Sequence, residues 1–182
     1  MAIPPIIGGM ETIETTYFAM GCFWGAERLF AQISGVTRTE VGYMGGHTDN
    51  PSYQQVCTDT TGHAETVRVD FDPQQISYRQ LLETFFSHHN PTTLNRQGAD
   101  IGSQYRSQIF PTTADQEKTA QAVILELSPQ IQNLYGSAPV TEISSAAHLP
   151  PFYPAEDYHQ RYLEKNPQGY CSIRDNGLMK CN

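Results

Sequence analysis

One short stretch, AMGCFWGAERLF, places a cysteine where a reactive thiol is commonly found. Cys22 follows the β-forming residues TTYFAM (15–20) and precedes Leu29, Phe30 and Ile33 at helical spacing, so it marks a turn from a strand into a helix. A free thiol is only about 3% ionised at pH 7, and the N–H groups at a helix start lower its pKa. The position fits a nucleophile and a small buried hydrophobe about equally well.

The neighbours of Cys22 allow the same two interpretations. Gly21 and Gly25 leave room for a molecule to approach the backbone, or permit a tight turn. Phe23 and Trp24 could be core residues, as aromatic side chains beside turns usually are. They could instead form an apolar wall that holds a methyl or thioether group beside the thiol, because sulfur packs well against ring edges.

Acidic and hydroxyl side chains elsewhere could complete a reactive site. Glu65, in GHAETV, fits a solvated strand end, but burial near Cys22 would raise its pKa and let it donate a proton near neutral pH. Asp100, in RQGADIGSQYRS, is bracketed by glycines, which is typical of a turn. Tyr53, in NPSY, and Tyr105 could each hold an oxygen that gains charge during a reaction.

The remaining cysteines suggest thiol exchange and not metal binding. Cys171 and Cys181 lie ten positions apart on a tail rich in proline and glycine, where a mobile thiol could reach a distant one, although both could be inert surface cysteines. Cys57 is interpreted as structural, since free cysteines are usually buried. We expect no metal site, because there is no C-x-x-C and no spacing typical of metal ligands.

The elements that must position these residues follow the order β-α-β-β-α-β-α-β. The sequence predicts strands at 15–20, 36–44, 63–72, 104–111 and 139–145, helices at 24–33, 77–89 and 113–127, and a short helix around 155–165. This order favours an α+β two-layer sandwich of ferredoxin-like kind, with a mixed or antiparallel sheet. We divide the single domain into an N-terminal arm (1–14), a catalytic core (15–147) and an irregular C-terminal tail (148–182).

Length and composition fit a folded globular protein. The chain has 182 residues, 38% hydrophobic content and a net charge of −8, without the basic clusters that nucleic acids or anionic membranes require. No apolar run is long enough to span a bilayer. The N-terminus lacks the basic region of a signal peptide, so we expect a cytoplasmic protein.

Six motifs, in order from about Thr16 to Cys171, resemble the peptide methionine sulfoxide reductase A family: GCFWG, VGYMGG, NPSY, GHAETVRV, QGADIGSQYRS and YHQRYLEKNPQGYC. The resemblance implies an oxidoreductase that reduces methionine-S-sulfoxide, free or in oxidised proteins, and so repairs oxidative damage. It implies no metal or organic cofactor, and thioredoxin as the external reductant. We expect a monomer.

The resemblance also implies a role for each candidate residue. Cys22 would attack the sulfoxide sulfur and become a sulfenic acid, while Glu65 would pass the thiol proton to the sulfoxide oxygen. Cys171 would then close a disulfide with Cys22, and Cys181 would move that disulfide outward. The substrate pocket would comprise Tyr53 and Tyr105 on the oxygen, Asp100 as support, and Phe23, Trp24 and Gly21 around the S-methyl group.

One departure from the family and two rival functions stand beside this interpretation. Between the tail cysteines the family often has a glycine-rich stretch, whereas SIRDNGLMK has only Gly177. A thiol acyl-transferase or hydrolase would use His63 as the base and would show a Cys–His hydrogen bond. A binding module would use the aromatic turn purely as core.

Overall fold

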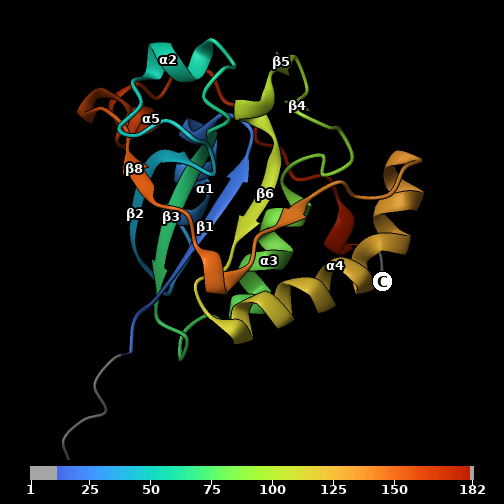
Figure 1. Cartoon of the computed structure of the whole chain (residues 1–182). Coiled ribbons are helices and arrows are strands. Elements are labelled where there is room, and N and C mark those ends of the chain that lie inside the picture. The colour runs from blue at the N-terminus through green and yellow to red at the C-terminus, as the bar shows by residue number, and fades with distance from the viewer. Residues whose placement is uncertain (1–11, 181–182) are drawn as a thin grey trace, which may run out of the picture.

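The computed structural model describes residues 12–180, and a six-stranded sheet lies at its centre (Figure 1). The strand order is β7-β6-β1-β3-β2-β8, and every neighbouring pair is antiparallel except β6 and β7. The strands are β1 (Glu14–Met20), β2 (Val36–Met44), β3 (Ala64–Phe71), β6 (Ser107–Phe110), β7 (Glu142–Ile143) and β8 (Phe152–Pro154). A separate ribbon pairs β4 (Arg96–Gln97) with β5 (Asp100–Ile101). The α+β class with a mostly antiparallel sheet is confirmed, and the ferredoxin-like assignment stays a prediction.

Helices pack on the sheet around one main core. They are α1 (Phe23–Ala31), α2 (Tyr53–Cys57), α3 (Tyr78–Ser87), α4 (Ala114–Tyr135) and α5 (Tyr162–Lys165), with 3-10 turns η1 (Ser103–Tyr105), η2 (Ala146–His148), η3 (Asp157–His159) and η4 (Leu178–Lys180). Phe18 of β1 stacks between Phe30 of α1 and Phe85 of α3, at centroid distances of 4.9 and 5.2 Å. These rings fix α1, and with it the turn at Cys22, against the sheet.

The longest helix runs further than its sequence predicts. Thr113, where the predicted helix begins, caps α4, but the helix continues past 127 to Tyr135 and includes Pro129. Proline lacks an N–H and usually ends a helix, which is why the prediction stopped short. Leu127 and Ile131 are both buried against the core on either side of Pro129, so packing outweighs the lost hydrogen bond. Gly136, in the left-handed conformation, then ends the helix.

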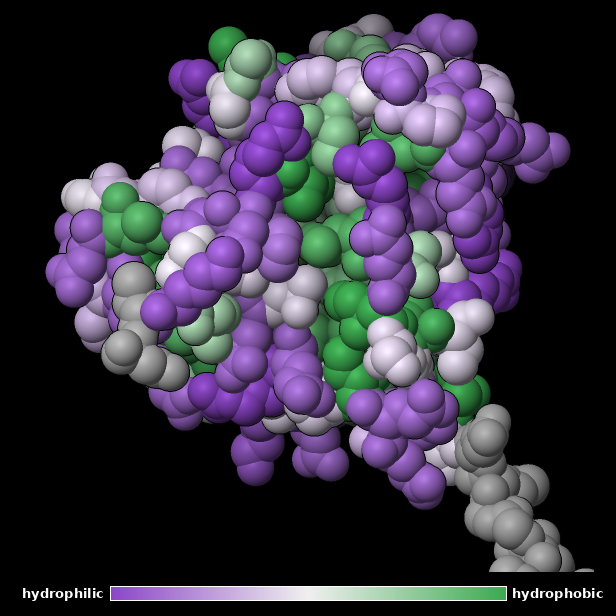
Figure 2. All heavy atoms as spheres, turned by 180° about the vertical axis from the view of Figure 1, so that it is seen from behind, coloured by the Kyte–Doolittle hydropathy of each residue, from purple (hydrophilic) through white to green (hydrophobic). Residues whose placement is uncertain are grey.

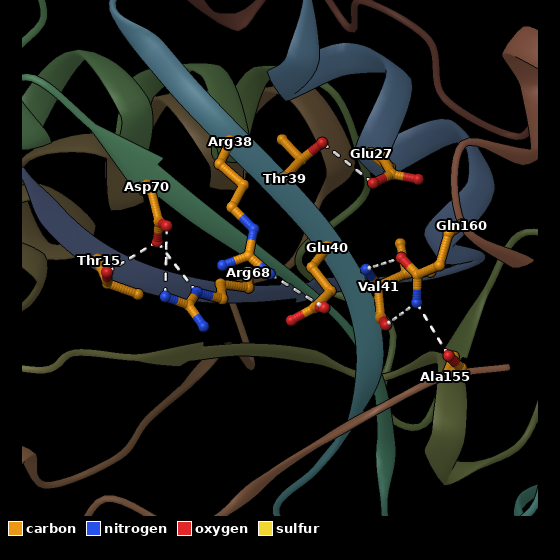
Figure 3. Close-up of polar contacts among 10 residues, drawn as sticks. All are labelled: Thr15, Glu27, Arg38, Thr39, Glu40, Val41, Arg68, Asp70, Ala155 and Gln160. Carbon is orange, nitrogen blue, oxygen red and sulfur yellow. Dashed lines mark hydrogen bonds and ion pairs between the residues drawn. The ribbon is translucent and has the colours of Figure 1, made fainter. Parts of the chain in front are cut away.

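The C-terminal tail is more regular than the sequence suggests, because it adds strand β8 to the edge of the sheet. Beyond β8, the side chain of Gln160 bonds to the backbone of β2, as a neighbouring strand would. Its oxygen accepts from the Val41 N–H at 2.9 Å, and its nitrogen donates to the carbonyls of Val41 and Ala155 (Figure 3). Buried Glu27 of α1 accepts from the Thr39 hydroxyl and from the Arg161 N–H. The tail is therefore tied to β2 and α1, beside Cys22.

The surface is mostly hydrophilic. Seen from behind, polar residues cover most of the molecule and hydrophobic residues gather in a central band (Figure 2). Across residues 12–180, no helix is long and apolar enough to cross a membrane.

Candidate active site

Cys22 is the N-cap residue of α1, as the strand–turn–helix pattern predicted. Gly21 precedes it with φ +97°, a left-handed conformation that other residues rarely adopt, so this glycine shapes the turn and does not line the cavity beside it. The Cys22 thiol makes no regular capping hydrogen bond. It faces the backbone N–H of Trp24, which favours the thiolate.

Glu65 lies beside this turn and is buried, with 2% of its surface exposed. Strand β3 holds it opposite Tyr43 of β2, and its Oε1 accepts from the Phe23 N–H at 3.1 Å. Burial raises the pKa of Glu65 to about 8, the Phe23 N–H opposes that rise, and the charge of Asp100 adds to it. Glu65 is therefore a carboxylic acid at neutral pH and not a solvated strand end.

The pKa of Cys22 moves opposite to the direction predicted from the helix start. Burial and, to a smaller extent, the nearby Glu65 charge together raise it to about 12, and the Trp24 N–H offsets only part of the rise. Desolvation of the thiolate is a larger effect here than one exposed end of a nine-residue helix. At neutral pH the thiol of Cys22 and the carboxyl of Glu65 therefore both carry their protons.

A cavity of about 90 Å³ opens onto these two groups. Eight residues line it: Cys22, Phe23, Trp24, Tyr53, Glu65, Asp100, Tyr105 and Tyr170. Burial raises the hydroxyl pKa of Tyr53 and of Tyr105, so both phenols stay protonated and can donate hydrogen bonds into the cavity. The structure thus brings together Cys22, Glu65, both tyrosines, Asp100 and the two aromatic residues that the sequence singled out.

Tyr53 belongs to helix α2, which is not among the helices predicted from the sequence. Ser52 and Gln55 form a capping box at the start of α2, and the S-x-x-Q pattern is the signal that could have revealed it. Glu156 of the tail accepts from the Tyr53 N–H at 3.2 Å and from the Tyr43 hydroxyl at 3.0 Å. Tyr53 is therefore held from both α2 and the tail.

The aromatic residues after Cys22 are both core and cavity wall. Phe23 is buried in the main core and also lines the cavity. The Trp24 ring stacks on Tyr162 at 3.7 Å, and its indole N–H donates to Nδ1 of His159 at 3.0 Å. His159 is buried and meets the Tyr53 ring edge-on at 4.6 Å, and burial lowers its pKa, so it stays neutral. The sequence analysis did not select His159 or Tyr162.

Tyr170 is a further cavity residue that sequence reasoning missed. Its hydroxyl donates to Oδ2 of Asp100 at 3.0 Å, linking the residue before Cys171 to the β4–β5 ribbon. It lies in GYC, next to a selected cysteine, but nothing in the pattern distinguishes it from a surface tyrosine.

Cys171 lies beside the first turn of α1. A Cβ atom built on Gly25 would lie 2.8 Å from the Cys171 Sγ, so the missing side chain of Gly25 makes the space for this thiol. Cys22, Cys57 and Cys171 are all free thiols. Cys57 is exposed at the end of α2, so the expectation of a buried structural cysteine is wrong. Cys181 lies outside the described residues.

The geometry does not support the rival function, a thiol acyl-transferase or hydrolase in which His63 acts as the base. Nδ1 of His63 accepts from the Gly46 N–H at 3.0 Å, and its Nε2 lies 2.6 Å from the Thr48 carbonyl. Both ring nitrogens are therefore committed to backbone groups, and His63 does not line the cavity. Among residues 12–180, no group of three His, Cys, Asp or Glu could hold a metal ion.

Comparisons with known proteins identify the family of this chain. The family model described as peptide methionine sulfoxide reductase matches residues 14–181. Peptide methionine sulfoxide reductase MsrA of Salmonella newport (strain SL254) is 51% identical over 166 residues, covering 91% of this chain and 77% of that protein.

Solved structures give the same result. Methionine sulfoxide reductase A of Corynebacterium diphtheriae has a TM-score of 0.84 and 41% identity, over 90% of this chain and 79% of that one. Mxr1 from Saccharomyces cerevisiae in reduced form has a TM-score of 0.80 and 36% identity, over 89% and 91%; Mxr1 has also been solved in complex with Trx2. This chain belongs to the peptide methionine sulfoxide reductase family and is an oxidoreductase that reduces methionine sulfoxide.

Proposed function

We propose that this chain reduces methionine-S-sulfoxide, free and in oxidised proteins, through a sulfenic acid on Cys22 that Cys171 resolves as a disulfide. The observation that carries the proposal is that a thiol and a buried carboxyl lie together at the start of one helix. Cys22 and Glu65 face the adjacent N–H groups of Trp24 and Phe23, at the mouth of a cavity lined by aromatic residues. Sulfoxide reduction needs a nucleophile and an acid together, because the oxygen leaves only after protonation.

Proton transfer follows from the two raised pKa values. The Glu65 oxygen that accepts from the Phe23 N–H is oriented by it, which leaves the second oxygen to carry the proton. Glu65 donates this proton to the sulfoxide oxygen and takes the proton of the Cys22 thiol, so no net charge is left in the cavity. Cys22 therefore loses its proton to Glu65 only when a bound sulfoxide accepts the proton that Glu65 already carries.

The cavity orients the sulfoxide. The hydroxyls of Tyr53 and Tyr105 donate to the oxygen as it gains negative charge. Phe23 and Trp24 offer the apolar surface for the S-methyl group, which turns one face of the sulfur towards Cys22. A chiral sulfur held at its methyl and oxygen presents that face only in one configuration, so the site selects one epimer.

The proposed reaction has three steps. The Cys22 sulfur attacks the sulfoxide sulfur, and the sulfoxide oxygen is transferred to Cys22, which releases methionine and leaves a sulfenic acid. The Cys171 thiol then displaces this oxygen as water and forms the Cys22–Cys171 disulfide. A reduced dithiol such as thioredoxin exchanges with the disulfide, restores both thiols and becomes oxidised; the family resemblance and the complex of Mxr1 with Trx2 support this reductant.

Two cysteine variants separate the steps. In Cys22→Ser, no methionine should form from methionine-S-sulfoxide. In Cys171→Ser, about one equivalent of methionine should form per enzyme, and turnover with thioredoxin should be lost. Quenched-flow chromatography of methionine and a thioredoxin-coupled assay measure the two quantities. Full thioredoxin-driven turnover by Cys171→Ser would overturn the assignment of Cys171 as the resolving cysteine. Methionine formation by Cys22→Ser would overturn the assignment of Cys22 as the nucleophile.

A further inference from the structure

Asn176 joins the tail to the end of helix α3. Its backbone N–H donates to the Ser87 carbonyl at 2.8 Å. Its side-chain nitrogen lies 3.0 Å from the Phe86 carbonyl and 3.1 Å from the His89 carbonyl, and both accept from it. The same nitrogen lies 2.9 Å from the Tyr135 hydroxyl of α4, so one residue contacts both helices.

These bonds complete the C-terminal end of α3. The last four carbonyls of a helix have no partner within it. In α3, the carbonyls of Thr84 and Phe85 are satisfied within residues 84–89, by the side chains of the histidines and Ser87 and by the His88 N–H. The carbonyls of Phe86 and Ser87 bond to Asn176 instead. This region of the tail is therefore built into the fold.

The anchor lies five residues beyond Cys171. Between them, Ile173 packs on the core, and a Cβ on Gly25 would lie 2.7 Å from its Cγ1. Just beyond the anchor, Leu178 of η4 is 4% exposed and belongs to the main core. Residues 171–176 thus span from the first turn of α1 to the end of α3, fixed at both sides.

We propose that Asn176 is a positioning residue for the resolving step: its bonds to the end of α3 hold the tail so that the Cys171 thiol lies over Gly25, ready to displace the oxygen on Cys22. This inference rests on the proposed function. Disulfide formation has strict geometry, with the two Cα atoms within about 4.4–6.8 Å, so a tail that drifts presents the thiol less often. The step itself joins the two sulfurs and releases the sulfenic oxygen as water.

A single-turnover experiment tests the inference on the full chain without thioredoxin. The enzyme is mixed with methionine-S-sulfoxide, and methionine, free thiols and the Cys22–Cys171 disulfide are followed by quenched flow and mass spectrometry. In Asn176→Ala, methionine should form at the unchanged rate. Disulfide formation should be roughly 10-fold slower, the factor expected for loss of one or two hydrogen bonds. Dimedone, which traps sulfenic acids, should label Cys22 more in the variant.

Control variants separate positioning from stability. Ser77→Ala removes the cap at the opposite end of α3 and does not touch the tail, so it should weaken the fold without slowing the disulfide. Asn176→Asp keeps the size of the side chain but sets a carboxylate against the Phe86 and His89 carbonyls at the negative end of α3, so it should slow the disulfide at least as much as Asn176→Ala. The backbone bond from the Asn176 N–H to Ser87 remains in both variants. Equal disulfide rates in Asn176→Asp and the unmodified chain, or equal slowing by Ser77→Ala, would overturn the inference. Methionine formation without any disulfide in the unmodified chain would overturn the resolving step itself.

Discussion

Replacing Gly25 by alanine should separate sulfoxide reduction from disulfide formation. Gly25 lies in the first turn of α1, and its missing side chain makes the space for the tail. A Cβ there would lie 2.8 Å from the Cys171 Sγ and 2.7 Å from the Ile173 Cγ1, where ordinary contacts begin at 3.4 Å. Both opposing atoms belong to the same segment of the tail. That segment must therefore move by about 1 Å or its side chains must leave their rotamers.

The magnitude follows from this displacement. A misplacement of about 1 Å can slow a positioned reaction by roughly 100-fold. Helix α1 itself should tolerate the change, because alanine is favoured over glycine inside a helix by about 1 kcal/mol. Overpacking against Cys171 and Ile173 costs about 1–3 kcal/mol and offsets this gain, so we expect thermal stability that is similar or slightly lower. We also expect a normal burst of about one methionine per enzyme and much slower formation of the Cys22–Cys171 disulfide.

The assay is the single-turnover reaction with methionine-S-sulfoxide, combined with a thermal melt. The burst of methionine serves as an internal control that the cavity is intact. A Gly25→Ala variant that forms the disulfide at the normal rate would refute the placement of Cys171 over α1. Loss of the burst together with the disulfide would show that Gly25 shapes the cavity and not only the space for the tail.

Three further variants test other parts of the site. Glu65 is protonated below its pKa of about 8, so the rate of methionine formation should fall as pH rises through about 8. In Glu65→Gln this fall at high pH should vanish from the pH profile measured by stopped flow. An unchanged profile would reject proton donation by Glu65. Ser52→Ala removes the cap of α2, costs about 1 kcal/mol and should slow methionine formation through Tyr53, which single-turnover kinetics would detect. Gly136→Ala meets no neighbouring atom but has φ +76°, so it should lower Tm by about 2–4 °C with unchanged activity.

Much of the sheet and the position of Cys22 between a strand and a helix could be predicted from the sequence, because their signals are local, whereas the burial of Glu65 beside Cys22 could not. Alternation of apolar residues predicts β3 closely, and the capping residue Ser77 predicts the start of α3. Cys22 follows from its position between a strand and a helix. These features depend on a few neighbouring residues, which one sequence displays fully.

The features that were missed depend on distant contacts. The sign of the Cys22 pKa shift comes from burial and from Glu65, 43 positions away in the chain. Strand β8 forms because it pairs with β2, and the tail residue His159 reaches the active site through Trp24. The extension of α4 through Pro129 is decided by core packing. None of these has a local pattern that would distinguish it from a loop.

The central claim is most directly tested by NADPH consumption in a mixture of thioredoxin reductase, thioredoxin and this chain, with each epimer of methionine sulfoxide supplied separately. Sustained NADPH oxidation is expected with the S epimer, none with the R epimer, and none with Cys22→Ser on either. Equal turnover of both epimers, or turnover by the Cys22→Ser variant, would contradict it.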